Sequence, residues 1–146
     1  MRRKIFLVNI LIVLIGFFIL TSCATSNNIG IDNYRIIENK NIISRNYEFN
    51  ENGNVTIKRD SGFMGVALDG TFSINNIEIF RIAAGEYYII NLEPGSYFFS
   101  LASAQGTNLG TPFVRTLRIN MTEGDRITLR IFPMPTQGLV MEEVLE

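Results

Sequence analysis

Histidine is absent from the 146 residues, and cysteine occurs once, at Cys23. Without histidine the chain lacks the usual base of Ser-His and Cys-His nucleophile systems and a common zinc ligand. One cysteine cannot form an intramolecular disulfide, so packing must stabilise the folded part. No Asp-x-Asp-x-Asp-Gly loop of the calcium-binding kind occurs either. We therefore expect no metal site, no cofactor and no enzyme activity.

Clustered positive charge is also lacking. The chain has 13 basic and 14 acidic residues, and three of the basic ones stand at positions 2 to 4. Residues 23 to 146 therefore carry 10 basic and 14 acidic side chains, a net charge of −4. Because nucleic-acid backbones are bound by clustered lysine and arginine, we expect no nucleic-acid partner.

The amino terminus has the order of an export signal. Arg2, Arg3 and Lys4 precede an almost unbroken apolar segment, residues 5 to 20. As a helix this segment would span about 24 Å, short of the roughly 30 Å hydrocarbon core of a bilayer. Residues 1 to 22 are therefore predicted to be a cleaved signal helix, and an uncleaved membrane helix is the alternative.

Leu20-Thr21-Ser22-Cys23, at the end of this segment, resembles the bacterial lipobox: an aliphatic residue, two small residues and a cysteine. In lipoproteins with this motif the signal is cut before the cysteine, its sulfur receives diacylglycerol, and the new amino terminus is usually acylated, for example with palmitate. The resemblance implies that Cys23 is the lipidation site and that the membrane is a partner through the lipid. A buried thiol or an intermolecular disulfide remains an alternative, whereas a nucleophile would need an activating base.

Residues 23 to 33 are predicted to be the lipidated cysteine and a flexible tether, because ATSNNIGIDN is small, polar or turn-forming. Ala24 stands where Gram-negative lipoproteins retained in the inner membrane tend to have aspartate. By resemblance, this favours the outer membrane. The predicted location is the cell envelope.

Residues 34 to 137 are predicted to form one all-β domain, a single antiparallel β-sandwich of Ig-like or transthyretin-like type. Short segments of strand periodicity separated by turn signals favour this class over alternating helices and strands. The expected strands are residues 34–37, 41–48, 54–59, 65–69, 77–82, 86–92, 96–102, 113–120 and 125–132. The turn signals are Asn52-Gly53, Asp69-Gly70, Asn75-Asn76, Ala84-Gly85, Pro94-Gly95 and Glu123-Gly124.

The most specific local prediction is a tight hairpin at Pro94-Gly95. Proline sets φ near −65° and glycine permits the positive φ of a type II turn, so residues 86–92 and 96–102 would pair across it. Residues 86–92 are apolar on both faces, which predicts a strand covered by the second sheet on one face and by a loop or terminal segment on the other. We interpret the aromatic residues here as core rather than as a carbohydrate platform.

The run from Val55 to Ala102 resembles a family of uncharacterised bacterial lipoproteins with a PEGA-like or transthyretin-like β-sandwich. The matching positions are Arg59, Ser61, Val66, Asp69, Gly70, Gly85, Tyr87, Leu92, Pro94, Gly95 and Tyr97. Residues 114–120, Gly124-Asp125 and residues 127–131 fit the closing strand pair of that family. The chain departs from the pattern at Ala67-Leu68 and in a longer polar insert at residues 105–110. The resemblance implies an accessory binding or spacer module.

Two segments are candidates for recognition. The loop at residues 61–65 places Phe63 and Met64, the candidate partner-binding residues, between glycines, and residues 138–146 form an apolar and acidic tail. We favour the interpretation that both fold back onto the sandwich. The carboxylate pairs Asp60 with Asp69 and Glu123 with Asp125 are interpreted as solvated turn residues.

The sequence therefore predicts a lipid-anchored envelope lipoprotein that acts as a non-catalytic binding or scaffolding module, with an envelope protein or a glycan as the possible partner. One alternative is a carboxylate-dependent hydrolase acting on envelope glycans. The other is a surface-exposed adhesin or inhibitor. A pocket with two convergent carboxylates would favour the hydrolase.

Overall fold

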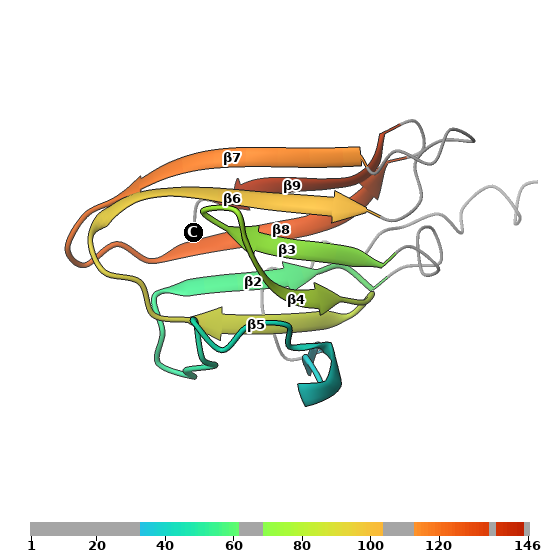
Figure 1. Cartoon of the computed structure of the whole chain (residues 1–146), viewed down its shortest axis with the longest axis horizontal. Coiled ribbons are helices and arrows are strands. Elements are labelled where there is room, and N and C mark those ends of the chain that lie inside the picture. Colours follow the sequence, from blue (N-terminus) through green and yellow to red (C-terminus); the bar gives the residue numbers. More distant parts are fainter. Residues whose placement is uncertain (1–32, 62–68, 104–112, 135–136, 145–146) are drawn as a thin grey trace, which may run out of the picture.

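The computed structural model describes residues 33–61, 69–103, 113–134 and 137–144 (Figure 1). In these ranges the chain is all-β, as predicted, with one short 3-10 turn at Asn39–Asn41 and no α-helix. The strands are β1 Arg35–Ile36, β2 Val55–Arg59, β3 Gly70–Ile74, β4 Ile77–Ile82, β5 Glu86–Ile90, β6 Gly95–Ser103, β7 Phe113–Met121, β8 Ile127–Met134 and β9 Gly138–Val144. Among the described residues no helix is long and apolar enough to cross a membrane. The predicted signal helix and tether lie almost wholly outside them.

The strands form two sheets that pack face to face. One sheet has the order β1-β5-β2-β8-β9, and the other has the order β4-β3-β6-β7 (Figure 1). Alternate side chains of each strand point into the space between the sheets, where the apolar ones are buried. The centre of this core includes Ile57, Leu129, Phe72, Phe80 and Phe99.

Two strand pairs are parallel, so the sandwich is not wholly antiparallel. β1 runs parallel to β5, and β2 runs parallel to β8. Parallel neighbours need a long crossover between them. For β2 and β8 the whole four-stranded sheet and β5 lie between them in the sequence.

The predicted hairpin at Pro94-Gly95 is wrong, because β5 and β6 belong to different sheets. After β5, the main chain of Leu92 is held by the side chain of Asn54: the Leu92 amide donates to Oδ1 and the Asn54 Nδ2 donates to the Leu92 carbonyl, both at 2.9 Å. The chain then passes to the other sheet, and Gly95 begins β6 without a positive φ. Proline and glycine occur in connections between sheets as well as in turns within one sheet. The Pro94-Gly95 pair therefore does not distinguish a hairpin from a connection between sheets.

The turn at Asn75-Asn76 is a true hairpin turn. Both residues have positive φ, 49° and 66°, as the two central residues of a type I′ turn require. The strand that it follows, β3, was not predicted, because Asp69-Gly70 was interpreted as a turn. Gly70 instead begins β3, where an added Cβ would come within 2.9 Å of Leu101 Cδ1. The strand expected at residues 65–69 lies, except for Asp69, outside the described residues.

Residues 138–144, which we expected to fold back as a tail, form β9. This strand pairs antiparallel with β8 from Thr128↔Val144 to Met134↔Gly138. Leu139 and Met141 point inward and are buried. The sandwich therefore extends past the predicted boundary at residue 137.

Residues 34–53, here called the N-terminal strap, close one open side of the sandwich (Figure 1, teal). The strap begins as β1 beside β5, touches β4 of the other sheet through a bridge from Ile42 to Phe80, and returns to β5 where the Asn50 amide donates to the Ile89 carbonyl at 2.9 Å. The strand expected at residues 41–48 is absent from this described segment, because the Asn41 and Ile42 amides close the 3-10 turn and the next two amides both donate to the Ile79 carbonyl. The strap covers part of β5, as the apolar pattern of that strand predicted.

Candidate functional site

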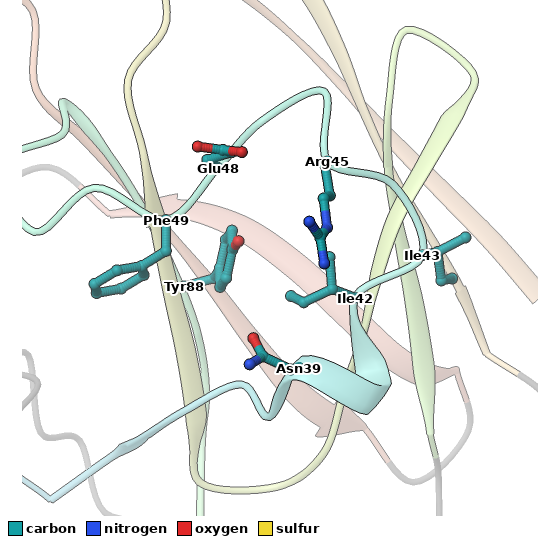
Figure 2. Close-up of a pocket in the computed structure, with 7 residues that line it drawn as sticks. All are labelled: Asn39, Ile42, Ile43, Arg45, Glu48, Phe49 and Tyr88. Atoms are coloured by element: carbon teal, nitrogen blue, oxygen red, sulfur yellow. The ribbon is translucent and has the colours of Figure 1, made fainter.

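The N-terminal strap and β5 enclose a cleft of about 320 Å³ (Figure 2). It is lined by Asn39, Ile42, Ile43, Arg45, Glu48, Phe49 and Tyr88. In Figure 2 the side chain of Arg45 points down beside Ile42 and Tyr88, while Asn39 and Glu48 lie at opposite ends of the opening. Six of the seven lining residues come from the strap, so its conformation determines the shape of the cleft.

Local hydrogen bonds fix the strap at both ends of the cleft. The 3-10 turn is closed by the Asn41 amide, which donates to the Glu38 carbonyl at 2.8 Å. The amides of Ile43 and Ser44 then donate to the Ile79 carbonyl of β4, at 2.7 and 3.1 Å. The next main-chain hydrogen bond to a strand is that of Asn50. Residues 45–49 therefore form a loop whose two ends are held by main-chain hydrogen bonds to strands.

An aromatic group forms the floor. The Tyr88 ring lies between Phe80 and Phe49, with ring centroids 4.8 and 5.5 Å away. Burial is the main cause that raises the pKa of Tyr88 above its ordinary value, and the Glu48 carboxylate adds to it, while a hydrogen bond with the Phe49 backbone acts in the opposite direction. The phenol is therefore neutral and donates hydrogen bonds at physiological pH. Because Phe80 belongs to the other sheet, the floor is tied to the core.

The cleft combines an apolar floor with charged groups at its opening. Arg45 and Glu48 are exposed, and Ile43 is 46% exposed. Apolar walls with a few placed polar groups are typical of ligand sites. This arrangement suits a ligand with one apolar group and an attached polar or charged group, such as a peptide segment.

One carboxylate, Glu48, lines this cleft. Glycoside hydrolysis in its common form needs two carboxyl groups on either side of the bond that is cut. In the part of the chain that the structure describes, no group of three or more His, Cys, Asp or Glu residues is placed to hold a metal ion.

A second polar cluster fastens the strap to the end of the sandwich. The Asp60 carboxylate, 1% exposed, accepts hydrogen bonds from Arg130 Nε at 3.1 Å and from Arg130 Nη2 at 2.6 Å. The Tyr34 hydroxyl donates to Asp60 Oδ1 at 3.2 Å. Burial, then the Asp60 charge, raises the pKa of Tyr34 to about 12. Arg130 also reaches Glu142 of β9 at 3.5 Å, so the cluster joins the strap, β2, β8 and β9.

The predicted role of Asp60 as a solvated turn residue is therefore wrong. Its charge is buried against Arg130, which is 70 residues away in the sequence. For Asp125 the turn interpretation is confirmed: its carboxylate accepts a hydrogen bond from the Thr122 amide at 2.7 Å. That bond lowers the pKa of Asp125.

The other predicted site residues lie outside the described ranges. Cys23 precedes them, and Phe63 and Met64 fall between Ser61 and Asp69. The lipidation site and the Phe63-Met64 loop therefore stay predictions.

Sequence reasoning missed the cleft because residues 41–48 were interpreted as a strand. A signal was present: Asn39-Lys40-Asn41 and Ser44-Arg45-Asn46 contain side chains that hydrogen-bond nearby backbone and favour turns over strands. The Asn46 amide does donate to the Ser44 hydroxyl, at 3.3 Å. Which sheet edge each turn would face could not be read from the sequence.

Comparisons of the chain with protein-family models, with curated proteins and with solved structures gave no match. The likeness to a family of bacterial lipoproteins therefore stays a prediction.

Proposed function

We propose that the chain is a bacterial envelope lipoprotein, held by lipid on Cys23, whose β-sandwich is a non-catalytic binding module. Leu20-Thr21-Ser22-Cys23 supports the anchor. The polar cluster supports the arrangement, because Tyr34, which follows the tether, is bonded to Asp60. By resemblance, Ala24 supports a location in the outer membrane of an organism that has one. Within the sandwich class, the module is of the PEGA-like or transthyretin-like kind.

The cleft under the strap is the observation that carries the binding role. Its floor is rigid, because Tyr88 packs against Phe80 and Phe49, and its opening offers Arg45 and Glu48. A fixed floor reduces the conformational entropy that is lost on binding. The ligand is an amphipathic segment of an envelope protein, with an apolar side chain on the floor and polar groups at Arg45 and Glu48. The hydrolase alternative would need a second carboxylate here, and the adhesin or inhibitor differs only in where the partner comes from.

Replacing Cys23 with alanine is expected to abolish incorporation of labelled fatty acid and to leave the precursor uncleaved, because the acyl chains attach to that sulfur. Labelling of bacterial cells that express the full chain, followed by electrophoresis, measures both effects. Ser26→Ala, in the tether, is the matched control and should be labelled and processed normally. A Cys23→Ala protein that is still labelled would refute the anchor.

A photo-crosslinker at Ile43 is expected to give a covalent adduct in intact envelopes, because this exposed side chain lines the cleft. The double variant Arg45→Ala, Glu48→Ala should remove the adduct without lowering the melting temperature, since both side chains are exposed. Arg126→Ala, exposed and outside the cleft, should leave the adduct intact. An adduct that persists in the double variant would refute the cleft as the binding site. If a photo-crosslinker at position 63 gives an adduct and one at position 43 does not, the contact is assigned to the Phe63-Met64 loop.

A further inference from the structure

The outer face of the sheet β4-β3-β6-β7 has an unusual set of side chains. Six of them are short hydroxyl or amide groups, and the exposed Val114 lies on the same face. The six are Thr71, Ser73, Ser96, Ser100, Thr116 and Asn120. They point away from the core, because their neighbours in the strands, such as Phe72 and Phe99, are buried. The face is therefore rich in hydrogen-bonding groups.

Side-chain hydrogen bonds order this face across β6 and β7. Ser96 donates to Asn120 Oδ1 at 2.6 Å, and the hydroxyls of Ser100 and Thr116 lie 2.9 Å apart. Arg118 Nε donates to Ser96 Oγ at 3.2 Å. Groups that are already held in place lose less conformational entropy when a ligand binds.

A large aromatic ring is exposed on this surface, next to the β3–β4 turn. Phe98, 46% exposed, pairs with Arg118 across the strands, and the Arg118 guanidinium carbon lies 5.7 Å from the ring centroid. The Phe98 amide is fixed in turn by the Asn75 carboxamide at 2.9 Å. An exposed aromatic face beside a fixed guanidinium offers one apolar and one cationic contact to the same ligand.

The charge of the face is opposite to that of the chain. Arg81 and Arg118 form no ion pair with any described residue, and the described part of the face has one acid, Glu78. Residues 23 to 146 as a whole carry a net charge of −4. Two cations are too few for a nucleic-acid backbone but suffice for spaced carboxylates. A second copy docked face to face would bring together two surfaces of the same sign.

We infer that this face binds a carboxylated polysaccharide. A sugar ring packs the C–H side of its ring on Phe98, because the negative face of the aromatic ring attracts those hydrogens. The free N–H groups of Arg118 pair with the sugar carboxylate, and Ser96 and Asn120 bond sugar hydroxyls. This binding surface is separate from the cleft. The inference depends on the proposed envelope location only for the source of the glycan.

Purified full-length protein in mild detergent tests the inference, with immobilised polygalacturonate as the probe and its methyl-esterified, neutral form as the matched polymer. The native chain should bind the acid form and not the ester. Phe98→Ala and Arg118→Ala should each weaken binding and so raise the dissociation constant about tenfold. Arg126→Ala, another exposed arginine, should not change it. Phe98→Trp keeps an aromatic face and should keep the affinity.

Equal binding to the ester and the acid, or an Arg118→Ala variant that binds like the native protein while its melting temperature is unchanged, would overturn the inference. Binding to phosphatidylglycerol vesicles that Arg118→Ala abolishes and Phe98→Ala does not would replace it with a general anion site. Loss of self-association in Phe98→Ala, measured by sedimentation velocity, would replace it with a dimer interface. Fatty-acid labelling at Cys23 is measured separately, so failure here leaves the anchor untouched.

Discussion

Replacement of Arg130 by methionine is expected to lower the free energy of unfolding by about 3 to 5 kcal/mol at neutral pH. The Asp60 carboxylate would then stay buried without the guanidinium that now gives it hydrogen bonds at 2.6 and 3.1 Å. The Tyr34 hydroxyl, at 3.2 Å, would still donate a hydrogen bond to that carboxylate. A hydroxyl cannot compensate for the charge. Urea unfolding followed by circular dichroism measures the change.

A double-mutant cycle separates the ion pair from the volume of the side chains. Asp60→Asn should lower stability as well, but the double variant Asp60→Asn, Arg130→Met should lose less than the sum of the single variants, because no charge is left buried alone. Arg126→Met is the matched control, since Arg126 is exposed and forms no ion pair with a described residue. Additive losses would show that Arg130 contributes through packing on Phe132, where its guanidinium lies 5.2 Å from the ring centroid, and not through Asp60.

The second large effect is expected at Gly53. A Cβ added there would lie 2.3 Å from the carbonyl oxygen of Ile90 and 2.5 Å from its carbonyl carbon. Both are backbone atoms of a buried strand residue, so neither can rotate away. Gly53→Ala should therefore lower the free energy of unfolding by about 2 to 3 kcal/mol, as overpacking of a core does.

Gly95→Ala is the control for that substitution. An added Cβ at Gly95 would meet the Tyr97 ring at 3.5 Å, an ordinary contact, and the φ of Gly95 is compatible with alanine. Its urea midpoint should stay close to that of the native protein. A Gly53→Ala midpoint equally close to native would show that the strap can move away from β5, against the close approach described here.

The elements that the sequence predicted well are those whose pattern is local. Residues 55–59 and 77–82 alternate or run apolar over a strand length, and they form β2 and β4. The sandwich follows from many such segments, because each must bury an apolar face against another sheet. The partner of each strand does not follow, since Pro94-Gly95 joins two sheets as readily as it closes a hairpin.

The candidate site was less predictable, because its residues meet through contacts between distant parts of the chain. The cleft needs the strap to bridge Ile42 with Phe80 and Asn50 with Ile89, which are contacts across about 40 positions. Asp60 looks like an ordinary polar residue at a strand end until Arg130 lies beside it. Buried charges of this kind are stabilised by their partners, and the partner is not visible in the neighbouring sequence.

The parallel pairing of β1 with β5 has a mechanical consequence if the chain is tethered through Cys23 as we propose. A pull along β1 from Cys23 shears the hydrogen bonds from the Arg35 amide to the Gly85 carbonyl and from the Ile37 amide to the Tyr87 carbonyl together, instead of opening them one after the other. The hydrogen bond from the Tyr34 hydroxyl to Asp60, just before β1, would carry part of the same load. Under the proposed function, with a lipid on Cys23 and a ligand in the cleft, a load would pass through residues 34–49 of the strap to the partner.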